Sequence, residues 1–225
     1  MSYFAVKITD EWGTSYQLTG AGYSTLVVLM IGILLGACFI AGEQKEKTAF
    51  STRQLVCSAM AMAIATVTSM IKVVDMPMGG SVTLFSMLFL TLTGYWYGLR
   101  GGMMTAIAYG FLQLILDPYI ISIPQMVTDY ILAFGALGLS GLFAGKAQGM
   151  VRGYLVGVLG RYFFSFLSGM IFFGSYASEF HMSAPIYSLI YNGAYLGLEA
   201  VLTLILISLP PVKRGLERIR QMAQG

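Results

Sequence analysis

Long apolar stretches alternate with short polar or glycine-rich segments along most of the chain. A helix that crosses the hydrocarbon core of a bilayer needs about 20 predominantly apolar residues. Measured against that length, the pattern predicts seven membrane-spanning helices, at Tyr23–Ala41, Gln54–Val74, Ser81–Tyr97, Gly102–Leu116, Gln125–Ala144, Gly153–Ser175 and Pro185–Leu209. The expected fold class is therefore an all-α polytopic membrane protein.

The basic residues fall on alternate connections between these spans. One set of connections holds ten of the thirteen lysines and arginines: 42–53, 98–101, 145–152 and the tail after residue 210. The other set, which comprises 75–80, 117–124 and 176–184, holds none. Because lysine and arginine concentrate in cytoplasmic loops, this alternation predicts an N-terminus outside the cell and a C-terminus inside.

Composition excludes the main alternatives to a membrane protein. Of the 225 residues, 57% are hydrophobic and 10% are charged, whereas an ordinary soluble domain has about 25% charged residues. The net charge of +3 is too small for binding driven by phosphate contacts. We therefore expect the lipid bilayer, and no nucleic acid, as a partner.

The sequence contains no recognisable catalytic or metal-binding motif. Cys38 and Cys57 lie inside apolar runs and His181 is the single histidine, so neither a disulfide framework nor a histidine metal cluster is expected. Around Gly145 and Lys146, Ser140 stands where a phosphate-binding loop has glycine, and Ala147 stands in place of its serine or threonine. We expect a protein that is not an enzyme and has no cofactor, and any active transport would need a separate ATPase or an ion gradient.

The first apolar run has two interpretations. It could be a signal peptide, with Leu35–Cys38 resembling a lipoprotein cleavage site, or it could be an anchor helix. Basic residues follow the run and no basic cluster precedes it, which favours an anchor helix that runs from outside to inside.

Three ionisable residues, Asp129, Arg161 and Glu199, lie well inside the predicted spans, where such groups usually face a bundle interior or a cavity. Arg161 and Glu199 lie about nine and ten residues from the inner ends of their helices, so their depths agree within roughly 2–3 Å. We expect these two side chains to form a structural ion pair.

Asp129 lies roughly 7 Å from the outer end of its span, at 1.5 Å per residue, with no partner at its own depth. A carboxylate in this position suits a cationic ligand. Alternatively, Asp129 has a structural role and bonds to Lys72, near the outer end of the second span, or to a helix terminus.

Polar and small residues recur at helical spacing on the last two spans, at Arg161, Ser165, Ser168, Gly169 and Phe172 and at Asn192, Tyr195 and Glu199. Buried polar groups need hydrogen-bond partners. Neighbouring helices would supply them, and so would a small, flat, polar ligand.

The second span contains four alanines, Ala59, Ala61, Ala63 and Ala65. Small residues four apart allow a second helix to approach closely within a membrane. Packing inside the same chain is the simplest interpretation of this pattern.

Five short motifs resemble, in order and spacing, the thiamine-specific S component of energy-coupling factor (ECF) transporters: Met76–Val82, Thr128–Phe134, Gly160–Phe164, Ser168–Ala177 and Ile186–Asn192. The resemblance covers about residues 54–210. It implies a substrate-binding subunit of the bacterial cell membrane that captures thiamine from outside, working with a T component and two ATP-binding subunits.

The resemblance also implies a division of the chain. A six-helix S-component bundle at 54–210 would follow an extracellular segment at 1–22 and an extra transmembrane helix with a basic loop at 23–53. A basic cytoplasmic tail would occupy 211–225.

The resemblance further implies roles for individual residues. Asp129 would face the thiazolium ring, and Tyr119 and Tyr130 would lie near the hydroxyethyl tail. Gly169, Tyr187 and Asn192 would bind the aminopyrimidine, on which Phe173 would stack. Ser165 would line the same site where the family usually has histidine, and Phe173 replaces the tryptophan of some members. The four alanines would dock on the T component.

Three other functions remain open. The ligand could be another small vitamin or a thiamine precursor, since weaker aromatic stacking is expected here. The protein could instead be a solitary ion-coupled transporter, or a structural membrane protein without a ligand.

Overall fold

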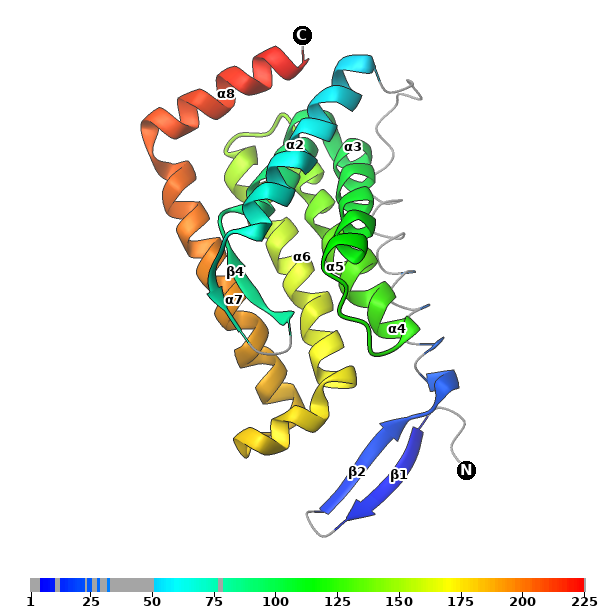
Figure 1. Ribbon diagram of the computed structural model, residues 1–225. Helices are drawn as coiled ribbons and strands as arrows, with labels where there is room; N and C mark the ends of the chain where they lie inside the picture. The colour runs from blue at the N-terminus through cyan, green and yellow to red at the C-terminus, as the bar shows by residue number, and fades with distance from the viewer. Residues whose placement is uncertain are drawn as a thin grey trace.

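The computed structural model describes residues 5–10, 13–22, 24, 25, 28, 32, 51–76 and 79–224 (Figure 1). The predicted first span, Tyr23–Ala41, lies outside these residues except for isolated positions, so it remains a prediction. Within the predicted outer segment, strands β1 (Ala5–Asp10) and β2 (Gly13–Leu18) pair antiparallel.

The rest of the chain is largely helical, with α2 (Thr52–Met70), α3 (Ser86–Leu116), a composite helix from Ile123 to Phe143, α6 (Gly149–Phe172), α7 (Ala184–Ser208) and α8 (Pro210–Gln224). Of these described helices, four are long and apolar enough to cross a membrane: α3, the composite helix, α6 and α7. The expected class of helical, multi-pass membrane protein is confirmed.

Helix α3 folds back on itself at Gly98, whose φ of 75° is in the left-handed region that favours glycine. The two arms then touch, since a Cβ built on Gly102 would lie 2.6 Å from Gly94 Cα. The reversal falls in the predicted break between Tyr97 and Gly102. It produces the two short antiparallel helices that the sequence predicted there.

The composite helix changes its winding along its length, through α4 (Ile123–Met126), the π-helix η2 (Val127–Leu132), α5 (Ala133–Gly135) and the 3₁₀-helix η3 (Ala136–Phe143). Its inner part packs against the reversal of α3, where a Cβ on Gly138 would lie 2.5 Å from Met103 N. The sequence predicted one regular helix here, because an apolar stretch does not reveal its winding.

A short hairpin separates α2 from α3. Strands β3 (Lys72–Asp75) and β4 (Ser81–Thr83) pair antiparallel, and Leu84 N donates to Thr68 O at the end of α2 (3.2 Å). The predicted continuation of two spans to Val74 and from Ser81 is therefore wrong. β-Branched residues are as apolar as helix formers, so hydropathy alone does not distinguish a strand here.

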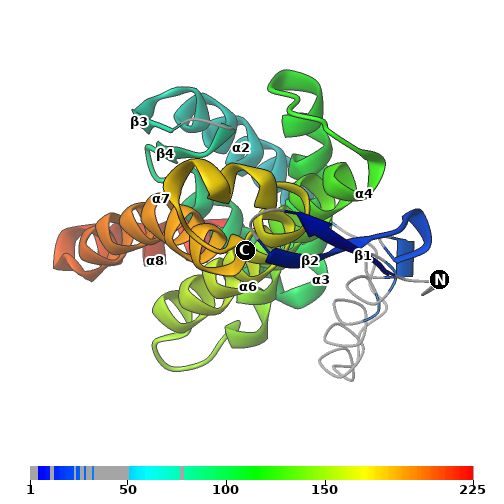
Figure 2. The same ribbon diagram turned by 90° about the horizontal axis from the view of Figure 1, so that it is seen from below.

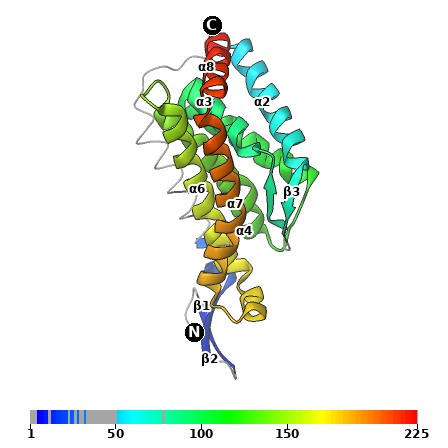
Figure 3. The same ribbon diagram turned by 90° about the vertical axis from the view of Figure 1, so that its left-hand side faces the viewer.

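The predicted basic tail is an ordered helix, α8. It contacts α2, α3 and α7, and Gln224 Nε2 donates to Trp96 O. In Figures 1 and 3, α8 crosses one end of the bundle.

The described helical segments between residues 52 and 208 alternate in direction, with the α3 reversal as one connection. The end crossed by α8 holds the basic connections 98–101 and 145–152 of the described chain (Figure 1). Seen along the bundle (Figure 2), the β3–β4 hairpin lies beside α2 and α7, both of which β4 contacts. This hairpin forms one wall of the cavity described below.

Gly138→Ala should destabilise the fold, because the added Cβ would push η3 away from the Met103 backbone. Overpacking of this kind costs about 1–3 kcal/mol. Thermal unfolding in detergent should show a clear fall in Tm. The matched control is Gly197→Ala on α7, where nothing lies within 4 Å of the built Cβ, and equal Tm values for the two variants would contradict the close contact.

Candidate functional site

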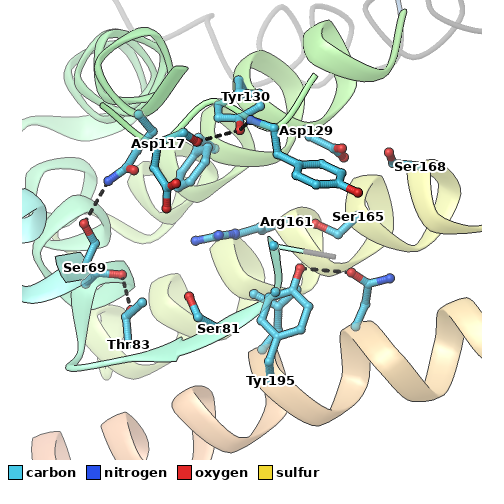
Figure 4. Close-up of a pocket in the computed structure, with 18 of the residues that line it drawn as sticks. Ser69, Ser81, Thr83, Asp117, Asp129, Tyr130, Arg161, Ser165, Ser168 and Tyr195 are labelled. Atoms are coloured by element: carbon cyan, nitrogen blue, oxygen red, sulfur yellow. Dashed lines mark hydrogen bonds between the residues drawn. The ribbon is translucent and has the colours of Figure 1, made fainter. Parts of the chain in front are cut away.

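A cavity of about 430 Å³ lies between the β3–β4 hairpin, the start of the composite helix and the outer halves of α6 and α7. Figure 4 shows side chains from these elements pointing into it. The cavity lies at the end of the bundle predicted to face outward.

All eight residues predicted to bind the ligand line this one cavity: Tyr119, Asp129, Tyr130, Ser165, Gly169, Phe173, Tyr187 and Asn192. They come from four separate parts of the fold. The structure therefore brings them together, while their individual binding roles remain predictions.

Asp129 lies in the π-helical turn η2. Such turns often occur at functional sites. Its Oδ2 accepts a hydrogen bond from Gln125 Nε2 (2.7 Å), and in Figure 4 the carboxylate lies beside Ser168. Among the described residues, Lys72 forms its ion pairs with Asp75 (3.7 Å) and Asp117 (3.5 Å) and not with Asp129. The Asp129 carboxylate therefore lines the cavity and forms no ion pair with Lys72.

Gln125 was not singled out from the sequence, although it positions this corner of the cavity. The residue is 1% exposed. It donates to Tyr119 O (3.0 Å) and accepts from Ile121 N (3.0 Å), in addition to contacting Asp129. One buried amide therefore holds the 117–122 loop against the acid.

Tyr130 also holds this loop. Its hydroxyl accepts from Tyr119 N (2.6 Å) and donates to Asp117 O (2.9 Å). Tyr119 in turn stacks on Phe173, with ring centroids 5.9 Å apart and planes at 22°. A hydrogen bond with Tyr176 raises the pKa of Tyr119, so its phenol is neutral at physiological pH.

A second group of rings continues along α7. Tyr187 and Tyr191 stack with centroids 5.7 Å apart, and Tyr191 meets Tyr195 edge to face. Tyr191 was not among the binding residues predicted from the sequence. Its hydroxyl accepts from Gly80 N (3.0 Å), which ties the hairpin side of the cavity to α7. Flat aromatic walls of this kind suit a flat ligand.

Gly169 allows α6 and α7 to approach closely. A Cβ at this position would lie 2.3 Å from Ser188 Oγ and 2.9 Å from Asn192 Nδ2. Asn192 itself donates to Ser188 O (2.9 Å) and accepts from Tyr195 OH (2.9 Å). These bonds fix the orientation of the amide at the cavity wall.

The predicted ion pair between Arg161 and Glu199 is wrong: no ion pair joins them in the part of the chain that the structure describes. Equal depth does not decide which way two side chains face. Arg161 points into the cavity (Figure 4), where its guanidinium carbon lies 4.2 Å from the centroid of Phe134 and its Nε lacks a hydrogen-bond partner within the described chain.

Glu199 instead accepts hydrogen bonds from the start of α3 and the end of β4. Its donors are Thr83 N (3.1 Å), Thr83 Oγ1 (2.7 Å), Ser86 Oγ (3.4 Å) and Met87 N (3.1 Å). Phe85, at the N-cap of α3, offers no side-chain cap. The Glu199 carboxylate therefore takes the place of a cap, a position that the helix dipole also favours.

The charges that line the cavity are unbalanced. Among its lining residues, Lys72 and Arg161 are basic, whereas Asp117, Asp129 and Glu199 are acidic. With all five ionised, one negative charge remains. A ligand with a single positive charge would neutralise the cavity.

The four alanines of α2 divide between two faces. Ala61 and Ala65 are 5% and 0% exposed, and Tyr109 OH donates to Ala65 O (3.2 Å). Residues two apart lie on nearly opposite sides of a helix, so these two pack inside the bundle, and their predicted docking role is wrong. Ala59 and Ala63 are exposed.

A helical bundle with an aromatic, acid-rich cavity towards one end is the architecture of a multi-pass membrane protein that binds and takes up a small molecule. Residues 55–217 match the family described as thiamine transporter protein (Thia_YuaJ). Because the match covers well over half of the chain, this protein belongs to that family. The family consists of bacterial membrane transporters and not of enzymes, in agreement with the sequence-based expectation.

Two relatives carry the name thiamine transporter ThiT. That of Bacillus subtilis (strain 168) is 33% identical over 151 residues, which cover 60% of this chain and 77% of the relative. That of Lacticaseibacillus paracasei (strain ATCC 334) is 30% identical over 130 residues, 48% of this chain and 64% of the relative. The alignment thus spans slightly less than two thirds of the second relative.

A solved structure of ThiT from Listeria monocytogenes has a similar fold. The TM-score is 0.58 at 23% sequence identity, and the match covers 70% of this chain and 94% of that chain. At this identity the comparison supports the fold alone.

Glu199→Gln should loosen the β4–α3 corner, because the NH2 that replaces one carboxylate oxygen cannot accept from the donors that this oxygen now satisfies. Leaving such buried donors unpaired costs about 1–3 kcal/mol. Hydrogen exchange should accelerate at residues 81–87. Glu179→Gln, at an exposed position, is the control, and unchanged exchange in the Glu199 variant would show that this carboxylate does not hold the corner.

Proposed function

We propose that this protein is the thiamine-binding S component of an ECF transporter. The observation that supports this most directly is the convergence of the Asp129 carboxylate, the Tyr119–Phe173 stack and the Asn192 amide on one cavity with an excess of one negative charge. Thiamine has complementary features, because it joins a cationic thiazolium ring to a flat aminopyrimidine and carries a hydroxyethyl tail.

Asp129 would provide the countercharge for the thiazolium ring. Its carboxylate lines the cavity and accepts a hydrogen bond from Gln125, and its two oxygens offer further acceptor positions to a ligand. A cation held in a dry site is stabilised much more strongly than one in water. Arg161 points into the same cavity (Figure 4), and its positive charge would keep the cationic end of the ligand away from it and direct that end towards Asp129.

The aminopyrimidine would lie between aromatic rings near α7. Phe173 offers a stacking face on one side of the cavity, and Tyr187 lies on the opposing helix. The Asn192 amide, oriented by Ser188 and Tyr195, would bind the polar edge of the ring. Gly169 would allow the ligand to approach the α6 backbone.

Transport would depend on partners outside this chain. We propose a T component and two ATP-binding subunits, because the sequence of this chain contains no phosphate-binding loop. The exposed pair Ala59 and Ala63 on α2 would form the small-residue surface that the T component approaches.

Asp129→Asn should weaken thiamine binding by about tenfold or more, since a charged hydrogen bond contributes about 1.5–3 kcal/mol. Isothermal titration of the purified protein measures this. Binding of neutral hydroxymethylpyrimidine should change little, because it carries no charge for Asp129 to compensate. Asp75→Asn is the control, since Asp75 does not itself line the cavity, although its ion-pair partner Lys72 does.

The ligand panel also separates the other possible functions. Tighter binding of hydroxymethylpyrimidine or of the thiazole moiety than of thiamine would identify a precursor as the ligand. Absence of any binding would indicate a structural protein. Unchanged thiamine affinity in the Asp129 variant would remove this residue from its proposed role.

Ala59→Phe combined with Ala63→Phe should abolish co-purification with the T component and the ATP-binding subunits, because bulky rings prevent a close helix–helix approach. Thiamine affinity should stay unchanged, since neither alanine lines the cavity. Ala194→Phe, on the exposed side of α7, is the matched control. An intact complex in the double variant, or uptake that needs only an ion gradient, would contradict the proposed docking.

A further inference from the structure

A second cavity, of about 500 Å³, lies at the opposite end of the bundle, between α6 and α8. Its lining comes from the loop and first turn of α6 at 146–151, from Tyr95 on α3, from the end of α7 and from α8. Positive-inside orientation places this end at the cytoplasmic surface of the membrane.

Cationic side chains dominate this cavity. Lys146, Lys213 and Arg220 line it, together with one acid, Glu217. Glu217 already accepts from Tyr95 OH (3.0 Å) and lies 3.7 Å from Arg220 Nη1. Neither lysine forms an ion pair within the described residues, and Lys146 Nζ lies 5.1 Å from the centroid of the Phe143 ring. The three basic residues of the lining therefore exceed its one acid by two charges.

Arg220 is held in place but is not saturated. Its Nη1 donates to Tyr95 OH (2.8 Å), and its guanidinium carbon lies 4.5 Å from the Tyr95 ring centroid. Its Nε is buried, and no hydrogen-bond partner for it exists in the described chain. A fixed guanidinium with an unused donor is suited to binding an anion.

The beginning of α6 adds backbone donors to the same cavity. Gln148, at its N-cap, provides no side-chain cap. The amides of Gly149 and Arg152 donate to Lys146 O and Gln148 O, whereas the hydrogen bonds of the described chain include none donated by Met150 N or Val151 N. The first turn of a 24-residue helix thus presents free N–H groups and its positive dipole end.

We propose that this cavity binds a phosphate group, supplied either by the headgroup of an anionic lipid or by free phosphate. Lys146 and Lys213 would neutralise its charge, Arg220 would donate from the α8 side, and the first turn of α6 would donate from the other. The bound group would join α8 to the bundle. Because this cavity and the outer one share no lining residue, the proposal is independent of thiamine binding.

The test compares the unmodified full-length protein with Lys146→Gln combined with Lys213→Gln. In the first arm, inorganic phosphate is titrated into protein in a neutral detergent and Tris buffer, with binding followed by calorimetry. In the second, native mass spectrometry counts the phosphatidylglycerol retained from a mixture with phosphatidylcholine. The matched control is Arg214→Gln combined with Arg218→Gln, which removes two charges from α8 outside this cavity.

A saturable response in either arm is expected, and it should weaken by about tenfold or more in the lysine variant, since two charge-assisted contacts are lost. The control should stay within about twofold, because neither Arg214 nor Arg218 lines this cavity. Binding in the phosphate titration identifies free phosphate as the source of the bound group. If phosphatidylglycerol is retained and free phosphate does not bind, the source is the lipid headgroup. Far-UV circular dichroism verifies that each variant is folded, and Lys213→Gln alone replaces the double variant if the latter does not fold. No response in either arm, or an equal loss in the control, overturns the proposal.

Discussion

The buried carboxylate of Glu199 joins α7 to β4 and α3, which lie more than 100 residues earlier in the sequence. From α7 it accepts hydrogen bonds from the end of β4 and from the first turn of α3, where Phe85 supplies no side-chain cap. An acid at the N-terminus of a helix is favoured by the free N–H groups and by the dipole. The β3–β4 hairpin is thereby held against α7, and one wall of the outer cavity depends on this bond network.

The outer cavity combines this anchored hairpin with a locally altered helix. In the π-helical turn η2, Asp129 faces the cavity while Tyr130 reaches back to the 117–122 loop. Gln125 links the same loop to Asp129. The acid, the loop and the Tyr119–Phe173 stack are therefore positioned together, which gives a small flat cation both a countercharge and a ring to stack on.

Much of this arrangement followed from the sequence, because charges are rare in a membrane protein and each must have a physical reason to be there. The alternation of basic connections predicted the direction of the helices, and the break between Tyr97 and Gly102 marked the reversal of α3. The eight predicted binding residues do line one cavity. The hairpin, the π-helical turn and the buried Gln125 were not predicted, since hydropathy does not distinguish a strand from a helix or one helical winding from another.

By itself, the sequence determined the class of protein and the order of the helices after residue 51, and it predicted their direction and an acid near the outer end. These depend on the length and polarity of segments, which a bilayer selects directly. Only the tertiary structure decided which charges meet: Glu199 faces the start of α3, Arg161 faces the cavity, and two of four alanines on α2 turn inward. Depth along a helix follows from residue number, whereas the direction in which a side chain points depends on how neighbouring helices pack.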